Sequence, residues 1–305
     1  MTNAQSPDWI AVDWGTSNLR AFAMRQSTVI AEAASDAGMG KLARDAFEPA
    51  LIRLITPWLT PGHQTPVVAC GMVGSRQGWF EAPYRTTPCI PLDPAALVAV
   101  PTTDPRITMH IVPGVAQNKP ADVMRGEETQ IAGALALNPG FDGVFCLPGT
   151  HTKWVHVSAG EVISFQTFMT GEMFALLSTQ SVLRHGMADG GWDDSAFDAA
   201  LSDALSRPEK IAANLFSLRA EGLLTGLAAP QARARLSGLL IGVELAAAKP
   251  YWLGQPIVII GADTLSATYA RALTAQGNTP GIVPANETVL AGLSLAHKKM
   301  METAP

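Results

Sequence analysis

Two segments of the chain, one near its start and one near its middle, repeat the same pattern. Residues 10–20 read IAVDWGTSNLR, and residues 144–154 read VFCLPGTHTKW. In each segment an apolar strand runs into Gly-Thr and small polar residues and then resumes as a strand. A glycine lets the backbone approach an anion closely, and the neighbouring amides and hydroxyls can donate to phosphate oxygens. One such turn alone is more typical of an ordinary β-hairpin, but the pair indicates a phosphate clamp for nucleotide phosphoryl transfer, in which Asp13 could hold a hydrated cation.

The secondary structure predicted around these turns is duplicated as well. Three short strands open each half of the chain, and helices and a buried strand follow them. The predicted strands are 9–13, 19–24, 29–34, 66–71 and 110–114 in the first half and 144–147, 154–157, 162–168 and 256–260 in the second. The predicted helices are 47–59, 122–137, 171–183, 195–205, 211–224 and 231–248, with two more at the end. The length of 305 residues suits two domains of about 150 residues, which we expect at 1–120 and 121–305 with the 122–137 helix bridging them.

The composition excludes several classes of protein. Hydrophobic residues make up 48% of the chain and charged residues 15%, which indicates a well-packed α/β protein. The formal charge is −5 and the basic residues are scattered, so nucleic acid is not an expected partner. Cys70, Cys89 and Cys146 lie far apart without metal-ligand spacing, which predicts a reduced cytoplasmic protein with no disulfide and no structural zinc. Residues 1–8 do not read as a signal peptide, and no window of 18 apolar residues predicts a membrane span.

A candidate catalytic base lies between the two repeated turns. Residues 124–135 read MRGEETQIAGAL, which places Glu127 and Glu128 at the start of a predicted helix. Either carboxylate could accept the proton of an attacking hydroxyl, and in phosphoryl transfer such a base acts mainly by positioning the nucleophile. The pair could also simply complement the helix dipole, which is worth about 0.3–1 kcal/mol. The two roles are compatible.

Other glycine-bearing segments carry weaker signals. Small residues at 132–134 and 290–293 would let two helices approach closely, as a hinge for domain closure or as ordinary core packing. The turn at 261–263, after a buried strand, is a usual place for a ribose or an adenine. Lys153 could reach phosphate or could be a solvated surface residue. The segment 38–42 reads GMGKL and lacks the spacing of a Walker A loop, so we reject it as a phosphate site.

Five strings in order resemble the 2-dehydro-3-deoxygalactonokinase family, within the actin, sugar kinase and heat-shock ATPase superfamily. They are DWGTSNLR at 13–20, CGMVGS at 70–75, RGEETQ at 125–130, PGTHTKW at 148–154 and MTGEMF at 169–174. The string IGAD at 260–263 is similar to the adenosine motif of the superfamily. The resemblance spans nearly the whole chain. It implies an α/β, two-domain actin-like ATPase (ribonuclease H-like) fold, with duplicated mixed sheets and an interdomain cleft.

The resemblance also implies a reaction and a set of residues. The reaction is ATP-dependent phosphorylation of the terminal hydroxyl of 2-dehydro-3-deoxy-D-galactonate, giving the 6-phosphate, in galactonate breakdown. Asp13 would hold Mg²⁺ through water. The residues implied at the nucleotide are Gly15, Thr16 and Ser17 from the first turn, Gly149, Thr150 and Lys153 from the second, and Gly261 and Ala262 at the adenosine.

The base and the substrate carboxylate are less closely defined. Many sugar kinases of the superfamily use aspartate as the base, whereas this chain has two glutamates, of which we favour Glu127. The anionic substrate needs cationic or amide donors, and a bidentate arginine is the natural choice. The arginines in or beside the matched strings are Arg20, Arg76, Arg85 and Arg125. We prefer Arg76, next to Gly74 and Ser75, although any of the others could bind the acid or form a structural ion pair.

Two alternatives remain open from the sequence. The first is a kinase for another sugar, such as an N-acetylhexosamine or an anhydro-sugar. The second is an actin-like protein that uses a nucleotide only as a conformational switch or to form filaments. Nothing in the chain resembles a DNA-binding helix-turn-helix or a long polymer-contact insertion. A homodimer is common among related kinases, but no residue here decides it.

Overall fold

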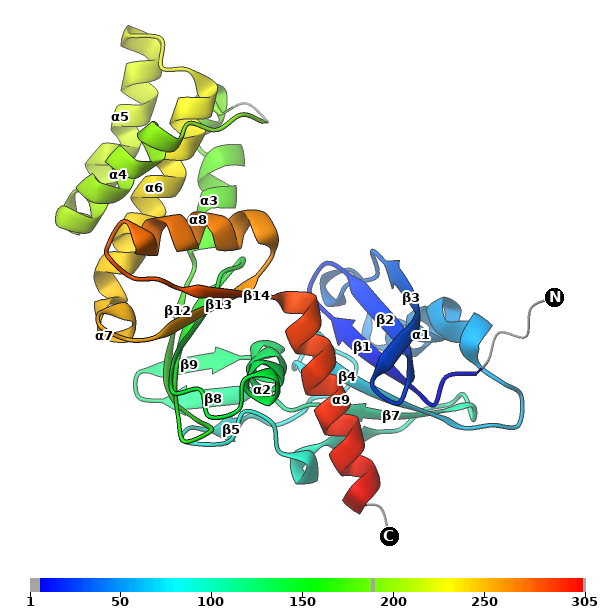
Figure 1. Cartoon of the computed structure of the whole chain (residues 1–305). Coiled ribbons are helices and arrows are strands. Elements are labelled where there is room, and N and C mark those ends of the chain that lie inside the picture. The colour runs from blue at the N-terminus through cyan, green and yellow to red at the C-terminus, as the bar shows by residue number, and fades with distance from the viewer. Residues whose placement is uncertain (1–5, 188–189, 304–305) are drawn as a thin grey trace. The chain divides into compact units, whose positions relative to one another are not determined.

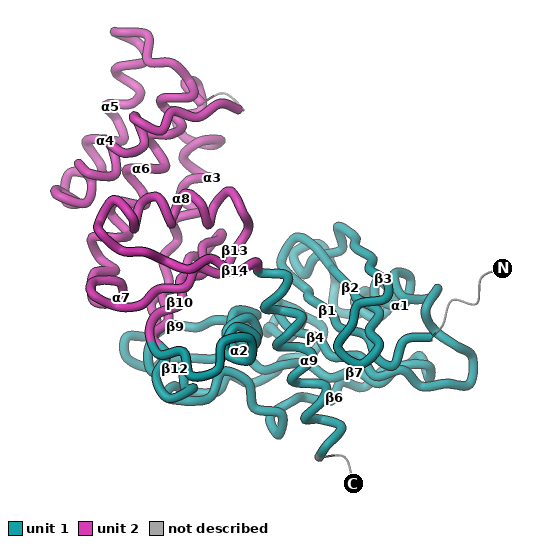
Figure 2. The backbone as a smooth tube through the Cα atoms, viewed as in Figure 1, with its two compact units in different colours: residues 1–142, 157–164, 285–305 teal, residues 143–156, 165–284 magenta. Residues whose placement is uncertain are grey.

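The computed structural model describes residues 6–187 and 190–303, and it divides into two compact units (Figure 2). Unit 1 comprises Met1–Asp142, Val157–Ser164 and Ala285–Pro305, and unit 2 comprises Gly143–His156 and Phe165–Pro284. The first five residues, part of the stretch in which we expected no signal peptide, lie outside the described residues. No helix in the described part of the chain is long and apolar enough to span a membrane.

Unit 1 is built on a six-stranded mixed sheet with the order β3-β2-β1-β4-β7-β6 (Figure 1). Its strands are β1 (Trp9–Trp14), β2 (Leu19–Arg25), β3 (Thr28–Ser35), β4 (Thr65–Gly71), β6 (Val98–Val100) and β7 (Ile107–Ile111). The first three form the predicted antiparallel meander, and β4 and β7 continue the sheet in parallel. A second, three-stranded sheet contains β5 (Arg85–Thr86), β8 (Val115–Asn118) and β9 (Ala121–Met124).

Alternate residues of β1 serve two different cores, as the period of two in a strand requires. Ile10 and Val12 face a core that includes Leu51 of α1 (Phe47–Ile55). Trp9 and Ala11 face a second core with residues of α2 (Glu127–Leu137) and α9 (Ala285–Thr303). The large sheet of unit 1 is therefore covered on both faces.

The two small-residue helices cross in close contact, as their sequences predicted. A Cβ at Gly133 of α2 would lie 1.8 Å from the carbonyl oxygen of Thr288 on α9, and a Cβ at Gly292 would lie 2.0 Å from that of Thr129. Only glycine allows this approach, because any side chain would overlap the facing backbone. The hinge role of these helices stays a prediction.

The sheet of unit 2 has the same strand order as the first five positions, β3-β2-β1-β4-β7, of the six-stranded sheet of unit 1. In unit 2 the order is β12-β11-β10-β13-β14. The strands are β10 (Gly143–Leu147), β11 (Thr152–Ser158), β12 (Glu161–Phe168), β13 (Ile257–Gly261) and β14 (Gly281–Pro284). The helices are α3 (Thr170–Thr179), α4 (Asp194–Ser206), α5 (Ile211–Leu224), α6 (Ala229–Ala247), α7 (Lys249–Trp252) and α8 (Asp263–Thr274). The repeated order confirms the predicted duplication of mixed sheets.

Short 3-10 helices connect several of these elements. They are Met39–Lys41, Arg44–Ala46, Thr56–Trp58, Met72–Gly74, Pro94–Ala96, Val182–Gly186 and Pro208–Lys210. The predicted 47–59 helix ends as α1 at Ile55 and continues as the 3-10 turn that contains Pro57, because proline lacks the amide that an α-helix needs.

The structure differs from the sequence prediction in several places, and strands β5, β6, β8 and β14 were not predicted. Residues 122–124, expected as the first turn of a helix, belong to β9, and the helix begins only after Gly126, whose φ of 108° no helix allows. The predicted 110–114 strand is β7, which ends at Ile111 before Pro113. The division expected at residue 120 falls instead at residue 142, and residues 285–305 rejoin unit 1, because α2 and α9 pack together on its sheet.

Candidate active site

The first Gly-Thr turn, between β1 and β2 of unit 1, is tight and open to solvent. The amide of Gly15 donates to the carbonyl oxygen of Asn18 at 2.9 Å, which closes the turn. Thr16 and Ser17 are exposed, so their hydroxyls are available to a ligand. Exposed hydroxyls on a tight turn can donate to an anion, and the phosphate role of this turn stays a prediction.

Residues 38–42, which we rejected as a Walker A loop, pack against this turn and hydrogen-bond to its backbone. The amide of Met39 donates to the Gly15 carbonyl at 3.0 Å, and the amide of Gly40 donates to that of Thr16 at 2.9 Å. A Cβ at Gly38 would lie 2.2 Å from the Ser17 carbonyl carbon. The glycines of 38–40 thus let two loops pack backbone to backbone, a role that the sequence analysis missed.

Asp13, the candidate for magnesium, is the last but one residue of β1 and its side chain is 19% exposed. Its Oδ2 forms an ion pair with Arg20, whose guanidinium also donates to Asn286. Its Oδ1 lies 4.0 Å from the Cys70 sulfur. The described residues contain no cluster of three metal-ligating side chains, but Mg²⁺ often binds through one carboxylate, water and substrate phosphates. Asp13 therefore fits a water-mediated role, and Arg20 is the structural ion-pair partner that we left open.

Two glycines bring the start of α2 against the end of β4, and the end of β4 against the end of β1. Gly71 at the end of β4 has a φ of 90°, and a Cβ there would lie 2.7 Å from the Trp14 carbonyl oxygen. Gly126 has a φ of 108°, and a Cβ there would lie 3.3 Å from the Gly71 Cα. Both positions favour glycine in conformation and in space. The ends of β1 and β4 and the start of α2 consequently meet at one corner of unit 1.

The two glutamates at the start of α2 have different environments. Glu128 is fully buried, and its Oε2 and Oε1 accept hydrogen bonds from the Gly126 amide at 2.7 Å and the Thr129 hydroxyl at 3.0 Å. Burial, and secondarily the charge of Glu127, raises the pKa of Glu128 to about 8. Glu127 is partly exposed, and its Oε2 accepts from the Arg125 amide at 3.0 Å. Because Glu128 is inaccessible and largely protonated at neutral pH, the geometry favours Glu127 as the base.

The two candidate arginines for the substrate acid also differ. Arg76 is exposed, and its carbonyl oxygen accepts a hydrogen bond from Arg44. Arg125 is only 8% exposed: its Nη2 donates to the Ala82 carbonyl at 2.8 Å, and its guanidinium lies 4.2 Å from the centre of the Tyr84 ring. The Nε and Nη1 atoms of Arg125 are buried without a hydrogen-bond partner. A guanidinium in this state favours an added anionic partner, since unpaired buried donors are costly.

Residues 74 and 75 lie beside Arg125. A Cβ at Gly74 would lie 2.9 Å from its Nη1, so glycine leaves room for the guanidinium. The Ser75 hydroxyl is also buried without a partner. Arg85 instead donates to the Ile90 carbonyl at 2.7 Å and lies 4.0 Å from Asp93, which marks it as structural.

The second Gly-Thr turn, in unit 2, is packed against the start of α3. A Cβ at Gly171 would lie 2.2 Å from the Gly149 carbonyl oxygen, and the Glu172 amide donates to the Thr150 carbonyl at 2.9 Å. Lys153 follows the turn but is only 6% exposed, and its Nζ lies 3.3 Å from the His151 carbonyl oxygen. The surface alternative for Lys153 is therefore wrong, and its phosphate role stays a prediction.

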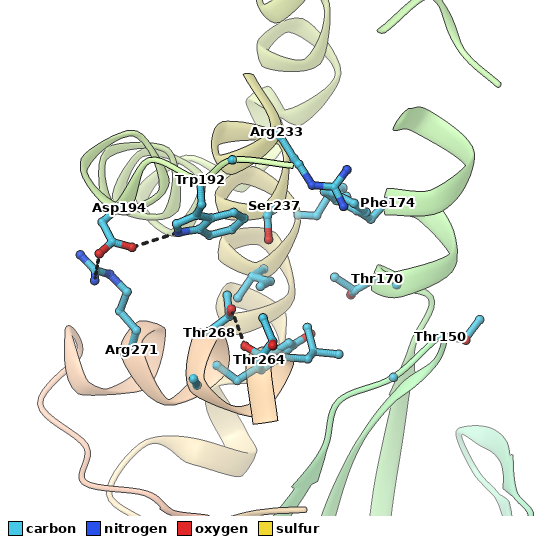
Figure 3. Close-up of a pocket in the computed structure, with 18 residues that line it drawn as sticks. Thr150, Thr170, Phe174, Trp192, Asp194, Arg233, Ser237, Thr264, Thr268 and Arg271 are labelled. Atoms are coloured by element: carbon cyan, nitrogen blue, oxygen red, sulfur yellow. Dashed lines mark hydrogen bonds and ion pairs between the residues drawn. The ribbon is translucent and has the colours of Figure 1, made fainter. Parts of the chain in front are cut away.

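A pocket of about 940 Å³ opens beside this turn within unit 2 (Figure 3). The volume lies in the range of small-molecule and cofactor sites. The second turn, α3, α6 and α8 contribute to its walls. Gly261 and Ala262 come just before α8 and are not among the residues that line the pocket, which on α8 begin at Thr264. The labelled lining residues are Thr150, Thr170, Phe174, Trp192, Asp194, Arg233, Ser237, Thr264, Thr268 and Arg271.

Comparison with known proteins identifies the family. The sequence matches the family described as 2-keto-3-deoxy-galactonokinase over residues 13–296. It is 41% identical to a protein of Rhizobium meliloti (strain 1021) named as a probable 2-dehydro-3-deoxygalactonokinase, over 95% of this chain and 96% of that protein. It is 36% identical to the 2-dehydro-3-deoxygalactonokinase of Escherichia coli (strain K12), over 95% and 97%. The chain belongs to the 2-keto-3-deoxy-galactonokinase family.

Solved structures support the same family and fold. A crystal structure bearing the name of a 2-dehydro-3-deoxygalactonokinase from Sinorhizobium meliloti has a TM-score of 0.88 at 39% identity, over 96% of this chain and 99% of that one. Component A of the Acidaminococcus fermentans (R)-2-hydroxyglutaryl-CoA dehydratase has a TM-score of 0.52 at 13% identity, over 97% and 100%, and shows the fold alone. These likenesses confirm the predicted fold class.

This member of the 2-keto-3-deoxy-galactonokinase family also contains a buried carboxylate that the sequence analysis missed. Glu244 of α6 is 2% exposed and accepts hydrogen bonds from Trp154, Thr170 and Tyr269. A single acidic residue within the apolar helical run LLIGVELAA at 239–247 was the available signal. Such a residue must find partners inside the fold.

Proposed function

We propose that the protein is an ATP-dependent kinase that phosphorylates the terminal hydroxyl of 2-dehydro-3-deoxy-D-galactonate and yields the 6-phosphate, in galactonate catabolism. The names of the family and of two relatives support this substrate. The reaction type is inferred from the partly exposed carboxylate of Glu127. It lies at the start of α2, which meets the end of β4 beside the end of β1 and the first Gly-Thr turn. As an ATP-dependent catabolic step, the reaction belongs in the cytoplasm.

The proposed chemistry is an in-line displacement. The terminal hydroxyl oxygen of the acid forms a bond to the γ-phosphorus, and the bond from that phosphorus to the β–γ bridging oxygen breaks, so ADP leaves. The hydroxyl proton passes to Glu127, whose main contribution is to hold the nucleophile in place. Gly15 would let the turn approach the phosphates closely, and the exposed Thr16 and Ser17 hydroxyls would donate to phosphate oxygens. Mg²⁺, held through water by Asp13, would neutralise phosphate charge.

The pocket of unit 2 is the proposed nucleotide site. Gly149 and Thr150 would donate to the phosphates, and Gly261 and Ala262 would border the adenosine. Support comes from the pocket itself, in which the second Gly-Thr turn and the residues after the 260–263 string line one cavity.

For the substrate carboxylate we propose Arg125 ahead of the initially preferred Arg76, with Gly74 and Ser75 beside it. The two buried, unpaired nitrogens of Arg125 support this choice. Arg125→Met should raise the Michaelis constant for the acid far more than that for ATP, whereas Arg76→Ala should affect both little. The reverse pattern in steady-state kinetics would return the role to Arg76.

An ATP-consumption assay with and without the keto-deoxy acid tests the function directly. We expect turnover only when the acid is present, and turnover that ignores the acid would exclude a kinase for it. Within the assay, Glu127→Gln should remove most turnover and leave nucleotide binding intact. Glu128→Gln is the matched neighbour and should retain activity at neutral pH. If Glu128→Gln is the inactive variant, the assignment within the pair is wrong.

A further inference from the structure

Unit 2 contains a buried carboxylate, Glu244, that the proposed reaction does not use. Glu244 accepts one hydrogen bond on Oε1, from the Trp154 indole at 2.8 Å. It accepts two on Oε2, from the Tyr269 hydroxyl at 2.8 Å and from the Thr170 hydroxyl. The three donors come from β11, α8 and α3. One side chain of α6 therefore connects three other elements of the unit.

Two of these donors reach the wall of the 940 Å³ pocket, since Thr170 and Tyr269 both line it. Tyr269 is further tied to the Thr152 hydroxyl at 3.0 Å, on the strand that follows the second Gly-Thr turn. Figure 3 shows Thr170 at the start of α3, beside the Thr150 turn. Glu244 thus lies behind the pocket, with its partners between it and the cavity.

The hydrogen bond from Thr170 to Glu244 ties α6 to the first turn of α3. Thr170 is the first residue of α3, and the next residue, Gly171, touches the Gly149 carbonyl so closely that no Cβ fits. The Glu172 amide binds the Thr150 carbonyl at 2.9 Å. The first turn of α3 is therefore held between Glu244 on one side and the second Gly-Thr turn on the other.

We propose that Glu244 is a positioning residue for the nucleotide site, which fixes the second Gly-Thr turn through Thr170 and the start of α3. The role of the turn in binding a nucleotide rests on the proposed function. Burying a carboxylate is costly unless hydrogen bonds satisfy it, and these three bonds do so while linking the helix to the turn. Glu244 touches no substrate in this scheme and acts only through its partners.

Hydrogen-bond chemistry predicts which substitutions preserve the arrangement. In Glu244→Gln, the amide oxygen can accept from Trp154, and the amide nitrogen can donate to the Tyr269 and Thr170 hydroxyls, which can rotate to accept. In Glu244→Leu, all three donors lose their acceptor. We expect Glu244→Gln to bind a non-hydrolysable ATP analogue within about threefold of the wild-type dissociation constant, and Glu244→Leu to bind it at least about tenfold more weakly.

A double-mutant cycle separates positioning from direct contact, because Thr170 itself lines the pocket. If Glu244 acts through Thr170, then Glu244→Leu combined with Thr170→Val should weaken analogue binding no more than the stronger single variant. Thr170→Ser keeps the hydroxyl that Glu244 accepts from and should bind the analogue as the wild type does. Thr179→Val is the matched control, since it removes a hydroxyl bond of 2.7 Å at the exposed far end of the same helix and should bind as wild type.

Calorimetric titration at a temperature where every variant is folded gives the result without the acid substrate. Additive losses in the cycle, or an unchanged dissociation constant in Glu244→Leu with only a lowered melting temperature, would overturn the proposal and leave Glu244 a stabilising residue. If the wild type binds the analogue but never phosphorylates the acid, the proposed function fails. The dissociation constants of the double-mutant cycle then still test the positioning role of Glu244. A wild type that binds no nucleotide overturns both.

Discussion

Replacing Glu128 by glutamine should change how the stability of the protein depends on pH. Burial raises the pKa of this carboxyl from 4.5 to about 8 in the folded chain. Between these values the unfolded chain has released the proton and the folded chain keeps it, so the free energy of unfolding falls as pH rises. The loss is about 1.4 kcal/mol per pH unit and reaches a ceiling of about 5 kcal/mol once the pH passes the folded pKa.

The glutamine variant keeps the local hydrogen bonds without this linkage. Its amide oxygen can accept from the Gly126 amide, and its amide nitrogen can donate to a rotated Thr129 hydroxyl. We therefore expect the variant and the wild type to be similarly stable at pH 5 and the variant to be more stable by several kcal/mol at pH 8. The comparison of slopes cancels the contributions of other buried groups.

Denaturant unfolding at pH 5, 6, 7 and 8 measures this difference. Glu127→Gln is the control, because that side chain is partly exposed and its charge is the lesser cause of the raised pKa of Glu128. The control should keep most of the wild-type slope. A Glu128→Gln variant that loses stability with pH as steeply as the wild type would refute the protonated, buried state of Glu128, and with it the reason for excluding Glu128 as the base.

Three further predictions concern backbone contacts and the metal. Gly171→Ala should weaken binding of an ATP analogue in calorimetry, because its Cβ would lie 2.2 Å from the Gly149 carbonyl oxygen; unaltered affinity would contradict the contact. Gly133→Ala should lower the free energy of unfolding by about 1–3 kcal/mol, whereas Gly222→Ala, a helical site with no atom within 4 Å, should raise it by about 0.5–1 kcal/mol in the same denaturation series. Asp13→Asn should weaken the Mg²⁺ dependence of turnover, and an identical metal titration would count against its role.

The strands and turns were predictable because their signals are contiguous in the sequence. The first predicted strand, 9–13, became Trp9–Trp14, and the two Gly-Thr turns fall where the repeat places them. Apolar runs that end in Gly-Thr report burial and chain reversal within a few residues. The repeated three-strand meander and the buried strand after it could therefore be anticipated in both units, whereas the strand order of the sheets was not predicted.

Features that depend on distant packing could not be predicted. The division of the chain at residue 142 follows from the contact between α2 and α9, whose sequences are far apart. The sequence could not show that Arg76 is exposed and Arg125 buried, because burial of a lone arginine leaves no local signature. Strand β9 was missed because it pairs with β8, a strand that the sequence analysis did not predict.

The two Gly-Thr turns show which features the sequence can predict and which depend on packing between distant segments. In unit 2 the start of α3 holds the Gly-Thr turn, with Gly171 against Gly149. In unit 1 residues 38–40 hold the first turn, and the start of α2 meets the end of β4, with Gly126 against Gly71. A buried glutamate accepts a hydrogen bond from each helix start, Glu128 from the Gly126 amide and Glu244 from the Thr170 hydroxyl. The first glutamate lies within its own helix start and the second lies on another helix. The sequence could therefore expose Glu128 as a candidate, whereas Glu244 needed the fold.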